Sequence, residues 1–142
     1  MYPCPIDIGH DGNSVWATSP MIPEFHTAAD DLLDLHARQA PDGMISALSL
    51  YIDRQQRVPM SKSAPDGDAV FLPTLTVAQI HLWNAMYDQH ITHEALASRL
   101  DCSAENARTL TDLMAEPEIE ELEQALVTIG YRLVVTSQPI DP

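Results

Sequence analysis

Cysteine and basic residues are scarce in this sequence. Among 142 residues there are two cysteines and seven lysines or arginines, against 21 aspartates and glutamates, which gives a formal net charge of −14. Cys4 and Cys102 lie far apart in the sequence and fit neither a disulfide framework nor a zinc motif, so we expect both to be small buried hydrophobic side chains. No segment approaches the roughly 18 apolar residues of a membrane-spanning helix. The first residues also lack a basic stretch and an apolar run, so we expect a cytoplasmic protein without a membrane partner.

The shortage of positive charge affects the choice of partner. Lysine and arginine contacts with phosphates supply much of the affinity of proteins for DNA. Because both halves of this sequence are acidic, the chain as a whole is poorly suited to bind nucleic acid nonspecifically. The charge instead favours a basic protein partner. The alternative is that the acidity serves only solubility.

Motifs of the common enzyme classes are absent as well. There is no glycine-rich phosphate loop, no GxSxG turn and no Cys/His pair at a nucleophile spacing. His81, His90 and His93 are not accompanied by a cysteine or carboxylate at a metal-binding spacing. A two-metal nuclease needs several carboxylates together, and the first predicted strand offers only Asp7. We therefore expect no catalytic residues, no metal, no cofactor and no enzymatic activity.

The N-terminal part begins with a predicted β-hairpin. Residues 2–8 and 14–22 are short extended runs, and the Asp11-Gly12 dipeptide between them is a strong hairpin signal. Residues 69–72 predict a third strand after a polar loop at residues 57–68. Both tryptophans, Trp16 and Trp83, stand in apolar surroundings, and we expect them in the core.

Between the hairpin and the third strand, residues 28–55 have helical periodicity. Leu32, Leu33 and Leu35 form one predicted apolar edge. Proline inside a helix costs roughly 3 kcal/mol because it lacks the N–H and its ring clashes with the preceding turn. Pro41 therefore predicts a break or sharp kink at residues 39–43.

The second half is predicted to be a set of short helices. Thr76 is expected as the N-cap of a helix that reaches about residue 90, and Gly130 is expected to end the last helix. The three helices between them are predicted at residues 93–100, 103–114 and 117–129.

Residues 91–113 have the spacing of a helix-turn-helix. Leu96, Ala97, Leu100, Ala107 and Leu110 form the inward face that two short crossing helices require. Asp101 is expected in the left-handed conformation of the turn, and Ser103 is expected to cap the second helix. The exposed positions that would meet a DNA groove and its phosphates are Thr92, His93, Ser103, Ala104, Glu105, Arg108 and Thr109.

The charges of this unit weaken the case for DNA binding. Arg99 and Arg108 stand against four acids between residues 92 and 113. Arg108 could contact guanine, and a dimer would double the set of contacts. The alternative is that the two helices serve only dimerisation.

Residues 131–137 alternate like a strand that has no mate in its own helical module. A lone strand of this kind commonly pairs with its copy in a second chain. We therefore predict a dimer, with tetramers left open, through Tyr131, Leu133, Val134 and Val135. The alternative is that this strand joins the N-terminal sheet, and residues 138–142 are a tail.

Several segments together resemble a known family over nearly all of residues 1–137. In chain order they are YPCPIDI, MIPEFHT, ALSLYID, VFLPTLTVAQIHLWNAM, the helix-turn-helix, and EIEELEQALVTIGYRLVV. Their order and spacing resemble the HicB antitoxins that end in a helix-turn-helix domain.

The resemblance implies an α+β protein with two domains. Residues 1–73 would be a partial ribonuclease-H-like β-β-α-β domain that binds and occludes a small basic HicA-type toxin, an mRNA-cleaving ribonuclease. Residues 74–137 would be an all-α helix-turn-helix domain with a C-terminal dimerisation strand, which binds operator DNA and so regulates its own operon. The acids that could meet the toxin are Glu24, Asp30, Asp31 and Asp34. They are equally consistent with a solvated face.

A function from another class remains open. The chain could be a free-standing transcriptional regulator whose N-terminal domain senses a small molecule. A neighbouring reading frame rich in lysine and arginine would favour the antitoxin over this sensor.

Overall fold

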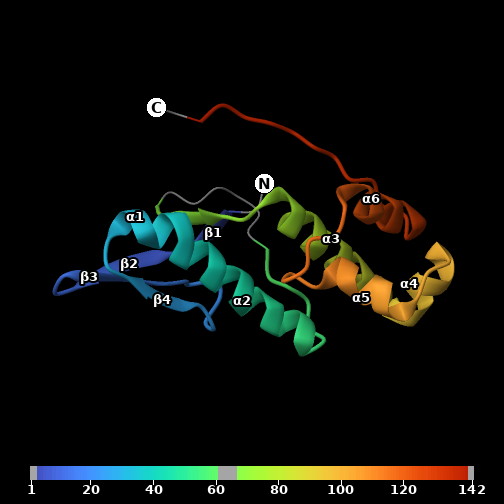
Figure 1. Ribbon diagram of the computed structural model, residues 1–142, viewed down its shortest axis with the longest axis horizontal. Coiled ribbons are helices and arrows are strands. Elements are labelled where there is room, and N and C mark those ends of the chain that lie inside the picture. Colours follow the sequence, from blue (N-terminus) through green and yellow to red (C-terminus); the bar gives the residue numbers. More distant parts are fainter. Residues whose placement is uncertain (1–2, 61–66, 141–142) are drawn as a thin grey trace.

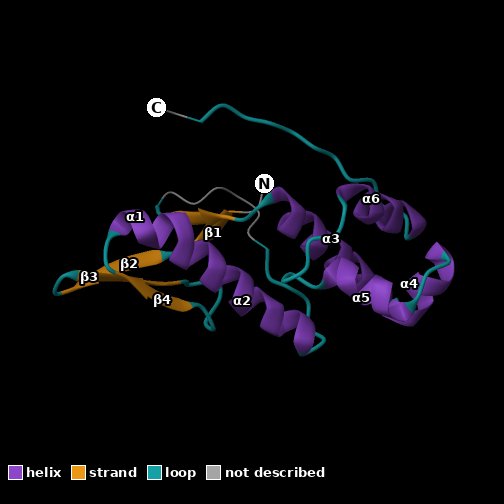
Figure 2. Cartoon of the chain, in the orientation of Figure 1, coloured by secondary structure: helices purple, strands orange, loops and turns teal. Residues whose placement is uncertain are grey.

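The computed structural model describes residues 3–60 and 67–140 and has the predicted mixed α+β composition (Figures 1 and 2). Figure 2 shows the strands at one end of the molecule and helices α3 to α6 at the other. Residues 61–66 of the predicted loop and the last two residues of the predicted tail lie outside the described residues. The strands are β1 (Pro3–Pro5), β2 (Asp7–Asp11), β3 (Ser14–Thr18), β4 (His26–Ala29) and β5 (Ala69–Phe71).

Strands β2, β3 and β4 form an antiparallel sheet in that order. The predicted hairpin is confirmed, with Asp11 opposite Ser14 and a turn between them. Gly12 has a φ of 63°, a conformation that glycine adopts without steric cost. The sequence does not predict strand β4, because HTAA has no strong strand propensity and its last two residues fall within the predicted helical range 28–55. Its pairing with β3 decides its conformation.

Strands β1 and β5 form a second, antiparallel pair in which Cys4 lies opposite Val70. Only Ile6 separates β1 from β2, and its backbone N–H donates to the Asp68 carbonyl at 3.0 Å. Residues 3–11 are therefore one extended segment, whose first part pairs with β5 and whose second part pairs with β3. The predicted third strand is confirmed as β5.

Of the predicted break or sharp kink at residues 39–43, the break is wrong. Helix α1 (Leu32–Asp34), the π-helical segment η1 (Leu35–Gln39) and α2 (Ala40–Asp53) follow one another without interruption. Pro41 lies in the first turn of α2. The wider π-helical turn ends with the Ala40 N–H donating to the Leu35 carbonyl. The π-helix is rare and appears mostly as a single wide turn inside an α-helix, as it does here.

The first hydrophobic cluster lies between this helix and the sheet. Figure 1 shows α2 lying across the strands, and the buried cluster joins Val15 and Ala17 of β3 to Leu35, Met44 and Leu48.

Two predictions about this core are wrong. Of the predicted leucine edge, only Leu35 is buried, whereas Leu32 is exposed and the exposed fraction of Leu33 is 78%. Trp16 is half-buried rather than in the core, because it points to the opposite face of β3 from Val15 and Ala17.

The C-terminal helices agree with the prediction apart from their ends. They are α3 (Thr74–Gln89), α4 (His93–Leu100), α5 (Ala104–Thr111) and α6 (Ile119–Thr128). Thr76 is not the N-cap of α3; Pro73 is, and Thr76 is buried within the first turn. Extended Pro73 allows the helix to begin three residues earlier than the polar cap signal of Thr76 indicated. Gly130, with a φ of 95°, follows α6 as predicted.

Helix α3 contributes to two hydrophobic clusters. Ile80 and Trp83 belong to the cluster of the sheet and α2. Leu82 and Met86 belong to the second cluster, which α3 shares with α4, α5 and α6. The predicted domain boundary at residue 73 falls directly before this shared helix.

The segment after α6 is extended but forms no strand within the described residues up to 140. Leu133 packs against the second cluster, whereas Val134 and Val135 are 74% and 75% exposed. No pairing of residues 131–137 with the N-terminal sheet occurs in the part of the chain that is described. Figure 1 shows this segment running away from α6 along the outside of the molecule.

Candidate functional site

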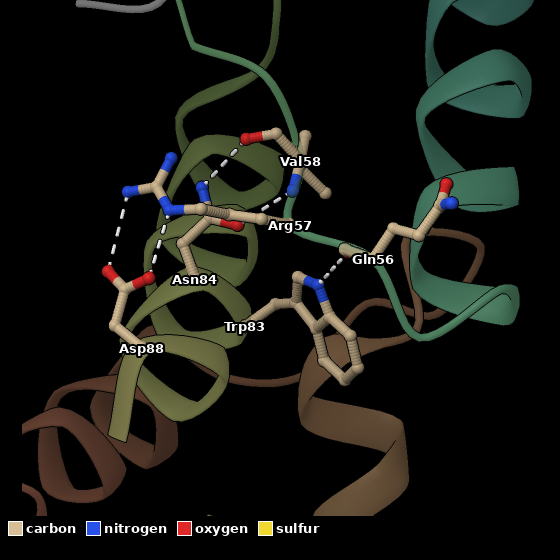
Figure 3. Close-up of polar contacts among 6 residues, drawn as sticks. All are labelled: Gln56, Arg57, Val58, Trp83, Asn84 and Asp88. Atoms are coloured by element: carbon tan, nitrogen blue, oxygen red, sulfur yellow. Dashed lines mark hydrogen bonds and ion pairs between the residues drawn. The ribbon is translucent and has the colours of Figure 1, made fainter. Parts of the chain in front are cut away.

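The segment after α2 forms polar contacts with α3 through three consecutive residues, Gln56, Arg57 and Val58 (Figure 3). The Trp83 indole N–H donates to the Gln56 carbonyl at 2.8 Å. Asn84 accepts from the Val58 N–H at 2.9 Å and donates to the Val58 carbonyl at 3.0 Å. The Asn84 side chain thus satisfies both backbone groups of a residue that is fully buried.

One turn further along α3, Asp88 completes these contacts, which we call the linker clamp. Arg57 donates to Asp88 through Nε at 3.0 Å and through Nη2 at 3.4 Å. Both side chains are close to half exposed, so this ion pair contributes at most about 1 kcal/mol. The buried amide contacts of Asn84 carry more of the stabilisation because an unpaired buried backbone group costs about 1–3 kcal/mol.

Trp83 also links the clamp to the C-terminal helices. Its ring stacks on that of His93, the first residue of α4, with centroids 5.9 Å apart and planes 27° apart. His93 Nε2 lies 2.8 Å from Oγ1 of Thr111, at the end of α5. Burial, and to a smaller extent the positive charge of Arg108, lowers the pKa of His93. The predicted phosphate donor His93 is therefore engaged in internal contacts.

The turn between α4 and α5 has the predicted backbone. Asp101 has a φ of 56° in the left-handed region, and the Cys102 N–H donates to the Ala97 carbonyl at 3.0 Å. The Ser103 hydroxyl accepts from the Asn106 N–H at 3.1 Å, which confirms the predicted cap. Thr92 caps α4 in the same way through the Ala95 N–H. Of the predicted inward face, all members are buried except Leu100, which is half-buried.

The outward face of α5 is mixed in charge. Glu105, Arg108 and Thr109 are exposed, and Ala104 is half-buried. The Arg108 guanidinium donates to the Glu94 carboxylate at 2.5 Å. This ion pair lies on the surface of both helices. Arg108, the one basic side chain of α5, is therefore partly neutralised by an acid of α4.

Three of the four acids predicted to meet a toxin have internal partners. Glu24 accepts from the Tyr51 hydroxyl at 2.6 Å and from Arg54 at 3.4 Å. The Tyr51 hydrogen bond is the main cause that lowers the pKa of Glu24. Burial, followed by the interaction with Glu24, raises the pKa of Tyr51 to about 12. Glu24 thus ties the segment before β4 to the end of α2.

The other acids lie around the start of α1. Asp31 caps α1 by accepting from the Asp34 N–H at 2.8 Å, and Asp34 pairs with Arg38 at 3.0 Å. Asp30 is exposed, and no side-chain partner is found for it among the described residues. Of the four acids, Asp30 is therefore the one for which the described residues provide no side-chain partner.

Neither cysteine forms a disulfide within the described residues. Cys4 is buried and free, and its burial raises its thiol pKa to about 12. Cys102 is free but only half-buried, contrary to the prediction. Within residues 3–60 and 67–140, no group of three His, Cys, Asp or Glu side chains could hold a metal ion. None of the helices in these ranges is both long and apolar enough to span a membrane.

A groove of about 630 Å³ separates the C-terminal segment from α3 and β5. Phe71, Val77 and His81 line one side, and Tyr131 and Val135 line the other. Phe71 is well exposed although it is a large apolar residue. Predicted dimerisation residues therefore form one wall of an open apolar groove.

Comparison with known proteins gives the family. No protein-family model matches the chain. Antitoxin HicB of Pseudomonas fluorescens (strain Pf0-1) is 33% identical to it over 138 residues, which cover 96% of this chain and 94% of the relative. The chain belongs to the HicB antitoxin family. The resemblance seen in the sequence is thereby confirmed, and the HicB relationship supports an antitoxin role in a toxin–antitoxin system.

The linker clamp of this HicB chain was not anticipated from its sequence. The available signal was a polar residue on a buried helix face: Asn84 and Gln79 both lie on α3 and are almost fully buried. Gln79 donates to the Asp112 carbonyl at 2.7 Å. Buried amides of this kind require a partner, but the sequence does not identify it.

Proposed function

We propose that this HicB chain is an antitoxin that binds a small basic HicA-type mRNA interferase and blocks it by occlusion. The observation that supports this most is the near full-length similarity to Antitoxin HicB. Occlusion requires a complementary surface and no turnover, which agrees with a role as a binding protein rather than an enzyme.

The charges of the N-terminal unit support a basic partner. Arg38, Arg54 and Arg57 are all paired with carboxylates of the same chain. The remaining acids of this unit are thus not neutralised by these arginines. Complementary charge speeds association and selects among partners more than it adds affinity.

For the C-terminal unit we propose a helix-turn-helix that binds operator DNA, with α5 as the recognition helix. The left-handed turn at Asp101 and the caps at Thr92 and Ser103 support this geometry. Arg108 would exchange Glu94 for a base or phosphate, at a small cost because an exposed ion pair is worth about 0–1 kcal/mol. Ser103, Ala104, Glu105 and Thr109 would lie beside it.

We propose further that two copies associate through the segment after α6. Tyr131, Val134 and Val135 are exposed apolar side chains on an extended backbone that has no pairing strand within the described chain. Association of two copies would bury them and place two α5 helices for two operator half-sites. Leu133 already packs on its own helices and would hold the segment in position.

A co-expression experiment tests the antitoxin proposal. A neighbouring frame that is rich in lysine and arginine should arrest growth when expressed alone, and this chain should restore growth and co-purify with its product. Growth arrest that this chain does not relieve, although it is expressed and folded, refutes the proposal. A neighbouring frame that is harmless would do the same and would favour a free-standing regulator.

A further inference from the structure

The sheet β2-β3-β4 has one face packed against helix and one face that is open. On β3, Val15 and Ala17 are buried in the first cluster, whereas Trp16 and Thr18 alternate with them and are half-buried. The pairing register places Gly9 of β2 and Ala28 of β4 on either side of Trp16. The open face therefore has a tryptophan at its centre and very small residues beside it.

The indole of Trp16 lies directly over Gly9. A methyl group at Gly9 would overlap the six-membered ring of the indole, so only glycine fits beneath it. Ala28, on the other side, is exposed and too small to cover the ring. A shallow hollow of about 350 Å³ lies beside the indole, and Asp11, Thr18 and His26 contribute to its lining.

The polar side chains on this face are two aspartates, two hydroxyls and one histidine, namely Asp7, Asp11, Ser14, Thr18 and His26. Asp7 lies opposite Thr18, and Asp11 lies opposite Ser14, so both carboxylates are on the same face as Trp16 and both are exposed. The sequences of the three strands, DIGHD, SVWAT and HTAA, contain no lysine or arginine. An aromatic ring flanked by carboxylates attracts a cation through the ring and through charge together.

We infer that this face, formed by Asp7, Asp11 and Trp16, is the docking surface for arginine or lysine side chains of the toxin. The inference rests on the proposed function, which supplies a basic ribonuclease as the partner. A protein that cleaves RNA holds its substrate with basic side chains. An acidic, aromatic surface that engages those side chains would exclude RNA at the same time.

A second copy of this chain suits the face less well. In a symmetric contact through it, Asp7 and Asp11 would approach the same residues of the other copy, and like charges that oppose each other are unfavourable. The acids around α1 also suit the toxin less well, because Asp31 and Asp34 already have partners in this chain.

The test uses the full chain and the toxin co-purified from the native operon. Trp16→Leu keeps apolar cover over Gly9 but removes the aromatic ring, and it should weaken toxin binding about tenfold. The double variant Asp7→Asn with Asp11→Asn should weaken binding and make it less sensitive to salt. Binding is measured by isothermal titration calorimetry or by surface plasmon resonance at two salt concentrations.

Two matched controls locate the effect. Asp42→Asn with Asp53→Asn removes two exposed acids of α2, and Leu33→Ser removes an exposed apolar side chain of α1. Both controls should bind the toxin as the unchanged chain does. If circular dichroism shows that Trp16→Leu does not fold, the double aspartate variant alone decides the outcome. Both of its changed side chains are exposed, so these changes should not disturb folding.

The outcomes separate this inference from the proposed function. If the unchanged chain does not bind the toxin, the proposed function fails. If the unchanged chain binds and the sheet variants bind equally well, the inference alone is overturned. Loss of binding in the controls but not in the sheet variants overturns it too and places the toxin on the α1 and α2 side.

Discussion

Replacement of Asn84 by alanine tests whether the linker clamp stabilises the fold. The change removes one acceptor and one donor that together satisfy the N–H and carbonyl of Val58. Because Val58 is 0% exposed, water cannot replace either partner without opening the structure. Each backbone group left unpaired in such a place costs about 1–3 kcal/mol, so the free energy of unfolding should fall by about 2–6 kcal/mol.

Urea denaturation followed by circular dichroism measures this loss. With a slope of about 2 kcal/mol per M of urea, the transition midpoint should move down by roughly 1–3 M. Asp88→Asn is the matched control, because Asp88 lies on the same helix as Asn84. This change weakens only the exposed ion pair with Arg57 and should lower the free energy of unfolding by at most about 1 kcal/mol. A loss below about 0.5 kcal/mol for Asn84→Ala would refute the clamp as an energetic feature.

Three further predictions concern the α4–α5 unit. Asp101→Gly should raise the free energy of unfolding by about 1 kcal/mol, because glycine adopts the left-handed conformation at less cost; a lower urea midpoint would contradict this. Burial lowers the pKa of His93 in the folded state, so the unfolded state takes up the proton first as the pH falls. The free energy of unfolding should therefore be highest above the ordinary histidine pKa of about 6.5 and should decrease as the pH falls below it. His93→Gln should flatten that part of the pH profile, and an unchanged profile would contradict the role of this ring. In gel-shift assays with upstream DNA, Arg108→Ala should weaken a salt-sensitive complex about tenfold or more, whereas the absence of any complex at low salt, with or without toxin, would leave only dimerisation.

The α4–α5 unit was predictable because its determinants are local. The serine cap, the aspartate in the turn and the apolar spacing all lie within about two helical turns of the residues that they organise. The ends of these helices agree with the prediction to within a few residues for the same reason.

Several of the errors occur where distant parts of the chain decide the conformation. Strand β4 exists because β3 pairs with it, and the π-helical turn before Pro41 lets the helix continue over the sheet. The position of Trp16 depends on Gly9, which periodicity within one strand cannot identify. The clamp joins residues 26 or more positions apart, so only tertiary structure shows it.

The same distinction applies to the candidate site. The acids Glu24, Asp31 and Asp34 looked available in the sequence, yet each forms hydrogen bonds within the chain. Sequence composition established the excess of negative charge but not which carboxylates remain free to meet a partner.

Under the proposed function, this HicB chain blocks a basic ribonuclease by covering it. Cleavage of an mRNA by the purified toxin, followed while the full chain is titrated into the reaction, tests this most directly. If the chain acts by occlusion, cleavage falls in proportion to the added chain and stops at a stoichiometric ratio. Cleavage that continues at its full rate in the presence of excess folded chain would contradict it.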